Sequence, residues 1–227
     1  MRHGKKEMSF KPELVIFDLD GTLVEFPHDY LYRETYRIID SLSFPRVEQC
    51  VLQSCFSSFD YFRFVEESER DRFVEHFWRS FDHTNYPKPV PVAGALNLLK
   101  ALSEHGLPIA IATARTSSEE KLRAELAVTG FLPFVSMIAP RHFNDANWMD
   151  KRCQINYICE TLSIAPSGAV MVGDIPPDVI SARQAGVGFT VAVLSGGINK
   201  EILRSAEPDL LLPSVAEIHQ NSVMLIG

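Results

Sequence analysis

Two carboxylates separated by one residue, Asp18 and Asp20, directly follow the apolar run 14–17, and Gly21 and Thr22 come next. Carboxylates this close repel each other and lose hydration where a strand meets a core, so a cation or shared hydrogen bonds must compensate them. Gly21 allows a sharp turn directly after the pair. Ligands bind outside the carboxyl ends of strands in open α/β sheets. The pattern therefore favours a chemical site over an ordinary acidic turn.

A second acidic group has the same placement. Gly173, Asp174 and Asp178 follow the apolar run 169–172. Asp178 could serve only as the negative charge at a helix N-terminus, but Asp174 has no such simple explanation. Carboxylates from two strand ends suit Mg²⁺, a hard cation that prefers oxygen ligands and substrate phosphate. The predicted metal ligands are Asp18, Asp20, Asp174 and Asp178.

Single polar residues at other strand ends could bind a phosphate. Thr113 follows the run 109–112, where its hydroxyl could hold a phosphate oxygen, although a Thr there is more often a helix cap. Lys151 opens a predicted helix, where its charge opposes the helix dipole. It is either a solvated surface residue or a ligand of a bound phosphoryl group. Arg115 is interpreted as a surface residue that could touch substrate. Residues 195–197 could shape the rim of the site, although a flexible exit loop is the favoured interpretation.

Short apolar runs alternate with helical patterns along most of the chain. The runs are continuous, as expected of strands buried on both faces, and they cover 14–17, 109–112, 135–138, 169–172, 189–193 and 210–212. Helices are expected at 93–105, 117–130, 151–162 and 177–186, the second opening with a capping box from Ser117 to Glu120. The alternation predicts an α/β fold, a doubly wound parallel sheet with helices on both faces.

The segment 24–88 breaks this alternation. It has no strand-like run but three amphipathic stretches, and it contains nine of the fifteen Phe and five of the six Tyr. Because it is too long for a loop inside a compact domain, we expect an inserted all-helical subdomain whose aromatic residues form a small core and partly line a substrate pocket. The predicted organisation is a tail at 1–12, a core at 13–23 and 89–227, and the helical subdomain at 24–88.

Composition excludes several classes of protein. The chain has 227 residues, 22 Lys and Arg against 29 Asp and Glu, and a net charge of −7, which argues against nucleic acid as a partner. No run approaches the roughly 18 apolar residues of a membrane span, and the start lacks the apolar region of a secretory signal. The four Cys have no metal-binding spacing, so we expect reduced thiols and a cytoplasmic protein.

The ordered motifs resemble those of the haloacid dehalogenase (HAD) superfamily. They are Asp18-Leu-Asp20-Gly-Thr, then Thr113, then Lys151, then Gly173-Asp174 with Asp178. The insertion after the first motif looks like the helical cap of that superfamily, and residues 89–94 are similar to those of phosphoglycolate-phosphatase-like members. The resemblance covers about residues 13 to 195 and implies a Rossmann-like core.

The resemblance also implies roles for the motif residues. Asp18 would attack phosphorus and form an aspartyl-phosphate, and Asp20 would be the general acid and then the general base. Thr113 and Lys151 would hold the phosphoryl oxygens. Mg²⁺ would be held by the Asp18 carboxylate, the Asp20 carbonyl and Asp174, with Asp178 supporting that shell. The implied activity is Mg²⁺-dependent hydrolysis of a small phosphorylated metabolite by a monomer or homodimer.

Other activities within the superfamily are also weighed. Asp20 argues against a dehalogenase, which lacks a carboxylate at that position. A phosphonatase-like enzyme needs a cap lysine, and residues 24–87 contain no Lys. A phosphosugar mutase of the β-phosphoglucomutase kind stays open, because it would share the nucleophile, the acid/base residue and the metal. A non-catalytic protein phosphorylated on Asp, acting in signalling or binding, is the least favoured alternative.

Overall fold

The computed structural model describes residues 10–81, 85–141 and 149–220. At its centre is a six-stranded sheet of order β3-β2-β1-β4-β5-β6, in which all neighbouring strands are parallel. The strands are β1 (Leu14–Phe17), β2 (Ile109–Ala112), β3 (Met137–Ala139), β4 (Ala169–Gly173), β5 (Phe189–Val193) and β6 (Leu210–Leu212). The sequence predicted all six, although β3 begins two residues later than expected.

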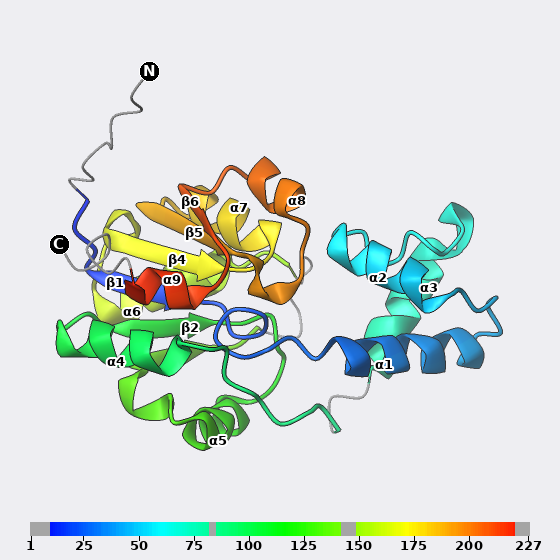
Figure 1. The fold of residues 1–227 in the computed structure, drawn as a ribbon, viewed down its shortest axis with the longest axis horizontal. Helices are drawn as coiled ribbons and strands as arrows, with labels where there is room; N and C mark the ends of the chain where they lie inside the picture. Colours follow the sequence, from blue (N-terminus) through cyan, green and yellow to red (C-terminus); the bar gives the residue numbers. More distant parts are fainter. Residues whose placement is uncertain (1–9, 82–84, 142–148, 221–227) are drawn as a thin grey trace.

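Helices cover both faces of this sheet (Figure 1). Val15 and Phe17 of β1 point into a cluster with α4 (Ala95–Glu104), α5 (Glu119–Thr129) and α9 (Val215–Gln220). Leu14 and Ile16 point the opposite way, toward α6 (Arg152–Leu162) and α7 (Pro176–Gln184). The short helix α8 (Lys200–Ser205) packs beside α7. Because successive side chains of a strand alternate in direction, β1 is apolar throughout, and the predicted doubly wound α/β fold is confirmed.

Three helices are inserted between β1 and α4 and lie beyond the carboxyl ends of the strands (Figure 1). They are α1 (His28–Ser41), α2 (Gln49–Ser57) and α3 (Glu67–Ser80). Ile38 of α1 and Phe73 and Phe77 of α3 are buried in a cluster of their own, so the predicted small core of this region is present. The domain boundaries remain a prediction, and residues 1–9 of the predicted tail lie outside the described residues.

The strand order reverses between β1 and β4. From β1 the chain proceeds outward through β2 and β3, and then through β4, β5 and β6 on the other side. Phe17 pairs with Val172, so the residues that follow these two strands emerge side by side. Such a switch point leaves a crevice at the carboxyl ends of the strands, where ligands bind. The fold thus brings Asp18 and Asp174 to the same place.

The start of α5 differs from the expected capping box by one residue. Ser118, not Ser117, is the N-cap, and its hydroxyl accepts a hydrogen bond of 3.3 Å from the Lys121 backbone N–H. The expectation at Ser117 is wrong because the first helical residue is Glu119. Ser117 instead lines a cavity at the end of the sheet.

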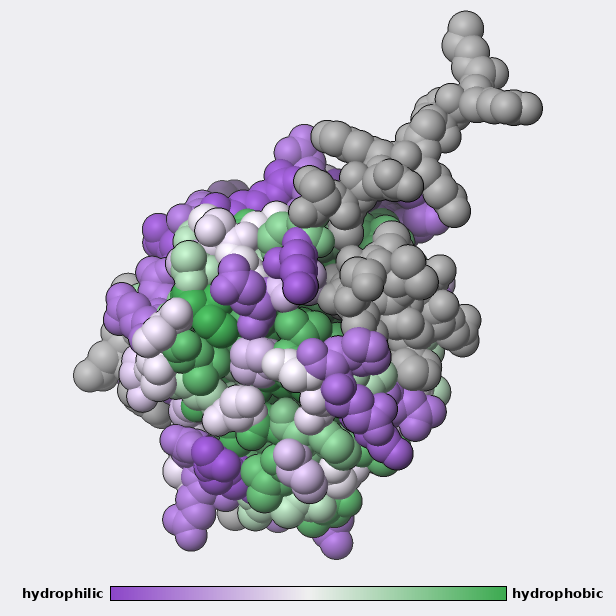
Figure 2. Space-filling view, turned by 90° about the vertical axis from the view of Figure 1, so that its left-hand side faces the viewer, coloured by the Kyte–Doolittle hydropathy of each residue, from purple (hydrophilic) through white to green (hydrophobic). Residues whose placement is uncertain are grey.

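Within the described ranges no helix combines the length and apolarity needed to cross a membrane. Figure 2 shows the end of the molecule that carries α4 and α9 in Figure 1, where hydrophobic residues lie among hydrophilic ones. A few large hydrophobic side chains, such as Leu96 and Val128, are exposed on the helices, which is normal for a protein surface.

Candidate active site

Three carboxylates gather where β1 and β4 end. Asp18, Asp174 and Asp178 are all buried, and each offers an oxygen within 4.8 Å of the other two. Asp178 lies in the first turn of α7, and its Oδ2 accepts hydrogen bonds from the Asp174 and Ile175 backbone N–H groups at 3.0 and 3.1 Å. It therefore caps the helix, as the simpler interpretation held, and also belongs to the acidic cluster.

Lys151 is the cation of this cluster. Its side chain is 1% exposed, and its Nζ forms ion pairs with Asp18 Oδ1 and, at 2.5 Å, with Asp178 Oδ1. The interpretation of Lys151 as a solvated surface residue is therefore wrong. Lys151 is the N-cap residue of α6, and this position directs its long side chain back toward the strand ends. The carboxylates outweigh the effect of burial and hold the pKa of Lys151 above its ordinary value.

The acidic cluster carries more negative charge than Lys151 neutralises. Burial is the main cause that raises the pKa of Asp18 to about 6, partly offset by Lys151. Burial, followed by the charges of Asp18 and Asp178, raises the pKa of Asp174 well above its ordinary value. Three carboxylates face one ammonium group, so a divalent cation would relieve the repulsion. Hard oxygen donors at this spacing fit Mg²⁺.

Glycines allow the chain to pass close to Asp174. A Cβ atom on Gly196 would lie 1.7 Å from Asp174 Oδ2, and one on Gly21 would lie 2.3 Å from the same oxygen. The hydroxyl of Thr22 donates a hydrogen bond of 3.1 Å to Asp174 Oδ1. Only glycine fits at these two positions, so the backbone at Gly21 and Gly196 packs directly against the Asp174 carboxylate. The loop 195–197 therefore forms part of the wall of the site, which agrees with the alternative that it shapes the rim and not with the favoured interpretation as an exit loop.

Asp20 lies beside the acidic cluster and has separate partners. Arg115 donates two hydrogen bonds to Asp20, from Nε to Oδ2 at 2.6 Å and from Nη2 to Oδ1 at 2.5 Å. Arg115 also pairs with Glu125 of α5, and its guanidinium lies 4.4 Å from the ring centroid of Tyr86. The Tyr86 hydroxyl donates a hydrogen bond of 3.2 Å to Asp20 Oδ1. The orientation of Asp20 is therefore fixed from two sides.

The interpretation of Arg115 as a surface residue is wrong. Its side chain is 11% exposed, because the loop after β2 folds back over the carboxyl end of β1. Sequence reasoning also missed Tyr86 and Glu125, which lie far from Asp20 in the chain. The position of Arg115, two residues after Thr113, was the one signal that could have pointed to this contact.

Thr113 is buried at the end of β2. Its backbone N–H donates a hydrogen bond to the Ala139 carbonyl at 3.2 Å, and its hydroxyl accepts one from the Arg115 backbone N–H, also at 3.2 Å. It is not a helix cap, because α5 begins at Glu119 behind its own N-cap. Thr113 lines the same cavity as Asp18 and Lys151.

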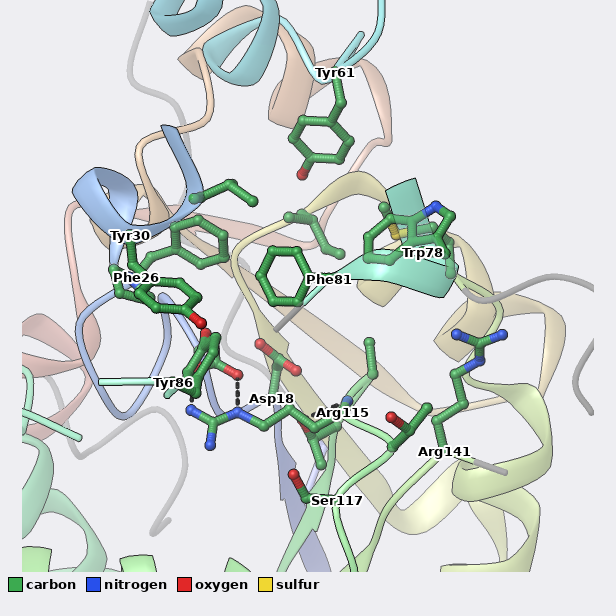
Figure 3. A pocket seen from close by; sticks show the side chains of 18 of the residues that line it. Asp18, Phe26, Tyr30, Tyr61, Trp78, Phe81, Tyr86, Arg115, Ser117 and Arg141 are labelled. Carbon is green, nitrogen blue, oxygen red and sulfur yellow. Dashed lines mark hydrogen bonds and ion pairs between the residues drawn. The ribbon is translucent and has the colours of Figure 1, made fainter. Parts of the chain in front are cut away.

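The cavity beside these residues has a volume of about 460 Å³ and lies between the strand ends and the inserted helices. Nine of its lining side chains are aromatic. Six of them are labelled around Asp18 in Figure 3, namely Phe26, Tyr30, Tyr61, Trp78, Phe81 and Tyr86. The prediction that some aromatic residues of the insertion line a pocket is therefore confirmed.

Tyr61 brings a polar group of the inserted region toward the acidic cluster. Its hydroxyl points down into the cavity (Figure 3). Burial, followed by the charges of Asp174, Asp178 and Asp18, raises the pKa of Tyr61 above its ordinary value. The phenol is therefore neutral at physiological pH. No motif in the sequence pointed to this residue.

The geometry can be compared with known proteins. A model of the haloacid dehalogenase-like hydrolase family matches residues 15–192. The chain belongs to this family. The family assignment agrees with the resemblance seen in the motifs and with the helical insertion after the first strand.

Curated relatives cover nearly the whole chain. The phosphoglycolate phosphatase of Neisseria meningitidis is 28% identical over 230 residues, covering 92% of this chain and 93% of the relative. The pyrophosphatase PpaX of Bacillus pumilus is 27% identical over 216 residues, covering 90% and 93%. A crystal structure of a predicted phosphatase from Clostridium acetobutylicum superposes with a TM-score of 0.74 at 20% identity, covering 95% of this chain and 100% of the other. This last likeness supports the fold.

Proposed function

We propose that the chain is a Mg²⁺-dependent phosphomonoester hydrolase that acts through an aspartyl-phosphate on Asp18. The observation that carries the proposal is the buried cluster of Asp18, Asp174 and Asp178 around Lys151, at the floor of a cavity large enough for an organic phosphate. The phosphatases among the relatives support the reaction class.

In the first step Asp18 attacks the phosphorus of the substrate. Lys151 pairs with Asp18 Oδ1 and orients the carboxylate, one oxygen of which forms the new bond to phosphorus. The bond from phosphorus to the leaving oxygen breaks, and Asp20 gives that oxygen a proton. Lys151 and Thr113 hold the phosphoryl oxygens while negative charge develops on them. The products are the alcohol and a phosphorylated Asp18.

In the second step Asp20 takes a proton from water, and the water oxygen attacks the phosphorus carried by Asp18. Inorganic phosphate leaves and the carboxylate of Asp18 is regenerated. The carboxylates of Asp18 and Asp174, supported by Asp178, and the Asp20 carbonyl would hold Mg²⁺. When bound, this ion would shield Asp18 from the charge of the incoming phosphate.

We also propose that residues 24–88 act as the cap over this site. The aromatic side chains of α1 and α3 and the phenol of Tyr61 already form the roof of the cavity. A roof of this kind excludes bulk water from the phosphorylated Asp18. It also leaves room for the alcohol that departs in the first step.

The decisive experiment follows phosphate release from p-nitrophenyl phosphate with Mg²⁺ in the wild type and in Asp18→Asn. The variant should lose at least about 10³-fold in kcat, because it removes the nucleophile. Acid-quenched wild type should carry one phosphoryl group on Asp18 by peptide mass spectrometry. Equal turnover by the variant would overturn the assignment of Asp18. A matched control is Asp29→Asn, which changes an exposed carboxylate of α1.

The mutase alternative is tested in the same assay with a hexose 1-phosphate. A hydrolase releases inorganic phosphate from it in step with its consumption. Isomerisation without phosphate release would instead establish a mutase. A protein that is only phosphorylated on Asp18 would release at most one alcohol per chain and then stop.

A further inference from the structure

The cavity above Asp18 is much larger than a phosphoryl group needs. Its volume of about 460 Å³ falls in the range of sites that enclose organic ligands of moderate size. In the proposed mechanism Lys151 and Thr113 hold the phosphoryl end of the substrate at the floor of the cavity. The remaining volume, toward the inserted helices, must therefore be filled by the leaving group of the substrate.

The roof of this volume is built from aromatic rings. In Figure 3 the Phe81 ring lies directly above Asp18, with Trp78 on one side and Tyr30 on the other. The Phe81 ring contacts Tyr30 edge-on, with centroids 5.9 Å apart, and lies 5.6 Å from Phe77. These contacts hold the rings in place before a ligand binds. Rings arranged in this way recognise another ring by offset stacking or edge contacts.

The roof offers little positive charge. Among the described residues, Arg79 is the one cation that the inserted region contributes to the cavity lining, and its 73% exposed side chain pairs with Glu75 at 2.6 Å. Arg115, Lys121 and Arg141 line the cavity from the core and not from the roof, and Arg115 is already held by two carboxylates. A second anionic group placed against the rings would lose its hydration without a matching cation from the roof, which is costly.

We propose that the substrate is a phosphate monoester whose leaving group carries an aromatic ring, and that this ring occupies the space beneath Phe81, Trp78 and Tyr30. The inference rests on the proposed function and names its substrate class. Pyrophosphate and phosphoglycolate, the substrates in the names of two relatives, carry a second anionic group in place of an aromatic ring. We therefore expect both to be poorer substrates of this chain than an ester with an aromatic leaving group.

The test compares two esters that differ only in the ring, 2-phenylethyl phosphate and ethyl phosphate, whose alcohols have nearly the same acidity. Burial of a phenyl group in a preformed apolar space should raise kcat/KM about 30-fold. Pyrophosphate and phosphoglycolate should fall below 2-phenylethyl phosphate. Equal kcat/KM for the two esters, or a preference for pyrophosphate or phosphoglycolate over 2-phenylethyl phosphate, would overturn the proposal.

A variant tests the placement of the ring. Phe81→Leu keeps an apolar side chain but removes the aromatic contact, so the preference for 2-phenylethyl over ethyl phosphate should fall about 3- to 10-fold. Tyr157→Leu, an exposed aromatic residue of α6, should leave the preference unchanged. An unchanged preference in a folded Phe81→Leu protein, with folding checked by circular dichroism, would place the ring elsewhere and overturn the proposed position.

Binding separates this inference from the proposed function. Asp18→Asn should bind 2-phenylethyl phosphate about 30-fold more tightly than ethyl phosphate in calorimetric titrations with Mg²⁺. If the wild type hydrolyses no ester but this difference is found, the hydrolase assignment fails and the aromatic site stands. If esters are hydrolysed but neither kcat/KM nor binding favours the ring, the hydrolase stands and the aromatic site fails.

Discussion

The Nζ atom of Lys151 lies 2.5 Å from Oδ1 of Asp178, and both side chains are 1% exposed. This ion pair connects the start of α6 to the start of α7, and Lys151 also reaches Asp18 after β1. The lysine thus joins three segments that are distant in the sequence. Its charge is what allows Asp18 and Asp178 to be buried together.

Lys151→Gln should damage both stability and activity. Removing one partner of a buried ion pair leaves the remaining carboxylates uncompensated, which costs about 3 kcal/mol. The free energy of unfolding, measured in urea without Mg²⁺, should fall by that amount, and kcat should fall at least about 100-fold. Lys200→Gln, which changes an exposed lysine of α8, is the control. A loss of less than about 1 kcal/mol would show that the ion pair is not structural.

Gly196→Ala should weaken the proposed Mg²⁺ site. Gly196 is not among the glycines with a positive φ, so the substitution adds no strain of that kind. The new Cβ would lie 1.7 Å from Asp174 Oδ2, so the carboxylate must move, and about tenfold more Mg²⁺ should be needed for half-maximal activity. Gly106→Ala is the matched control. Gly106 has a φ of +74°, and a Cβ added there would meet no atom within 4 Å, so this variant should lose about 1 kcal/mol of stability and keep its Mg²⁺ dependence. If both variants needed the same Mg²⁺ concentration for half-maximal activity, the close packing of Gly196 against Asp174 would not matter for the metal.

Arg115→Ala should lower kcat more than it raises KM. Without the two hydrogen bonds at 2.5 and 2.6 Å, Asp20 loses the fixed orientation that its proposed role as general acid and base requires, which should cost about 10- to 100-fold in kcat. Arg123→Ala removes an exposed arginine of α5, paired with Glu119, and should leave kcat within about twofold. If Arg115→Ala changed only KM, Arg115 would bind the substrate and would not position Asp20.

Mg²⁺ should stabilise the protein more at pH 8 than at pH 5. Burial raises the pKa of Asp18 to about 6 and that of Asp174 well above its ordinary value. A carboxyl group with a higher pKa in the folded state favours folding at low pH, and this contribution is lost as pH rises through the folded pKa. In the metal-free protein the repulsion between the ionised carboxylates of Asp18 and Asp174 is therefore larger at pH 8 than at pH 5. Mg²⁺ bound between them should relieve this repulsion.

Thermal unfolding with and without Mg²⁺ at the two pH values measures this difference. At about 100 times its Kd, the ion should raise Tm by about 5 to 10 °C at pH 8 and by less at pH 5. Asp174→Asn should remove most of the increase at pH 8. An increase that is the same at both pH values, or that persists in the variant, would argue against binding at the acidic cluster.

The sequence by itself determined the sheet and the position of the acidic cluster. Continuous apolar runs predict buried strands because both faces of a parallel sheet are covered, and Asp18 and Asp174 each follow such a run. A parallel sheet brings the carboxyl ends of its strands to one edge, so their proximity follows from the pattern. The family motifs then added Thr113 and Lys151, although the burial of Lys151 could not be seen from its place at a helix start.

Only the tertiary structure decided which distant residues surround these carboxylates. Arg115 and Tyr86 meet at Asp20 because a loop after β2 and the segment returning from the inserted helices converge there. The aromatic residues of the insertion were visible in the sequence, but helical periodicity gives the apolar face of each helix and not the neighbour it packs against. Whether a Phe fills a core or roofs a cavity depends on how the helices dock, which is a property of the whole packed assembly.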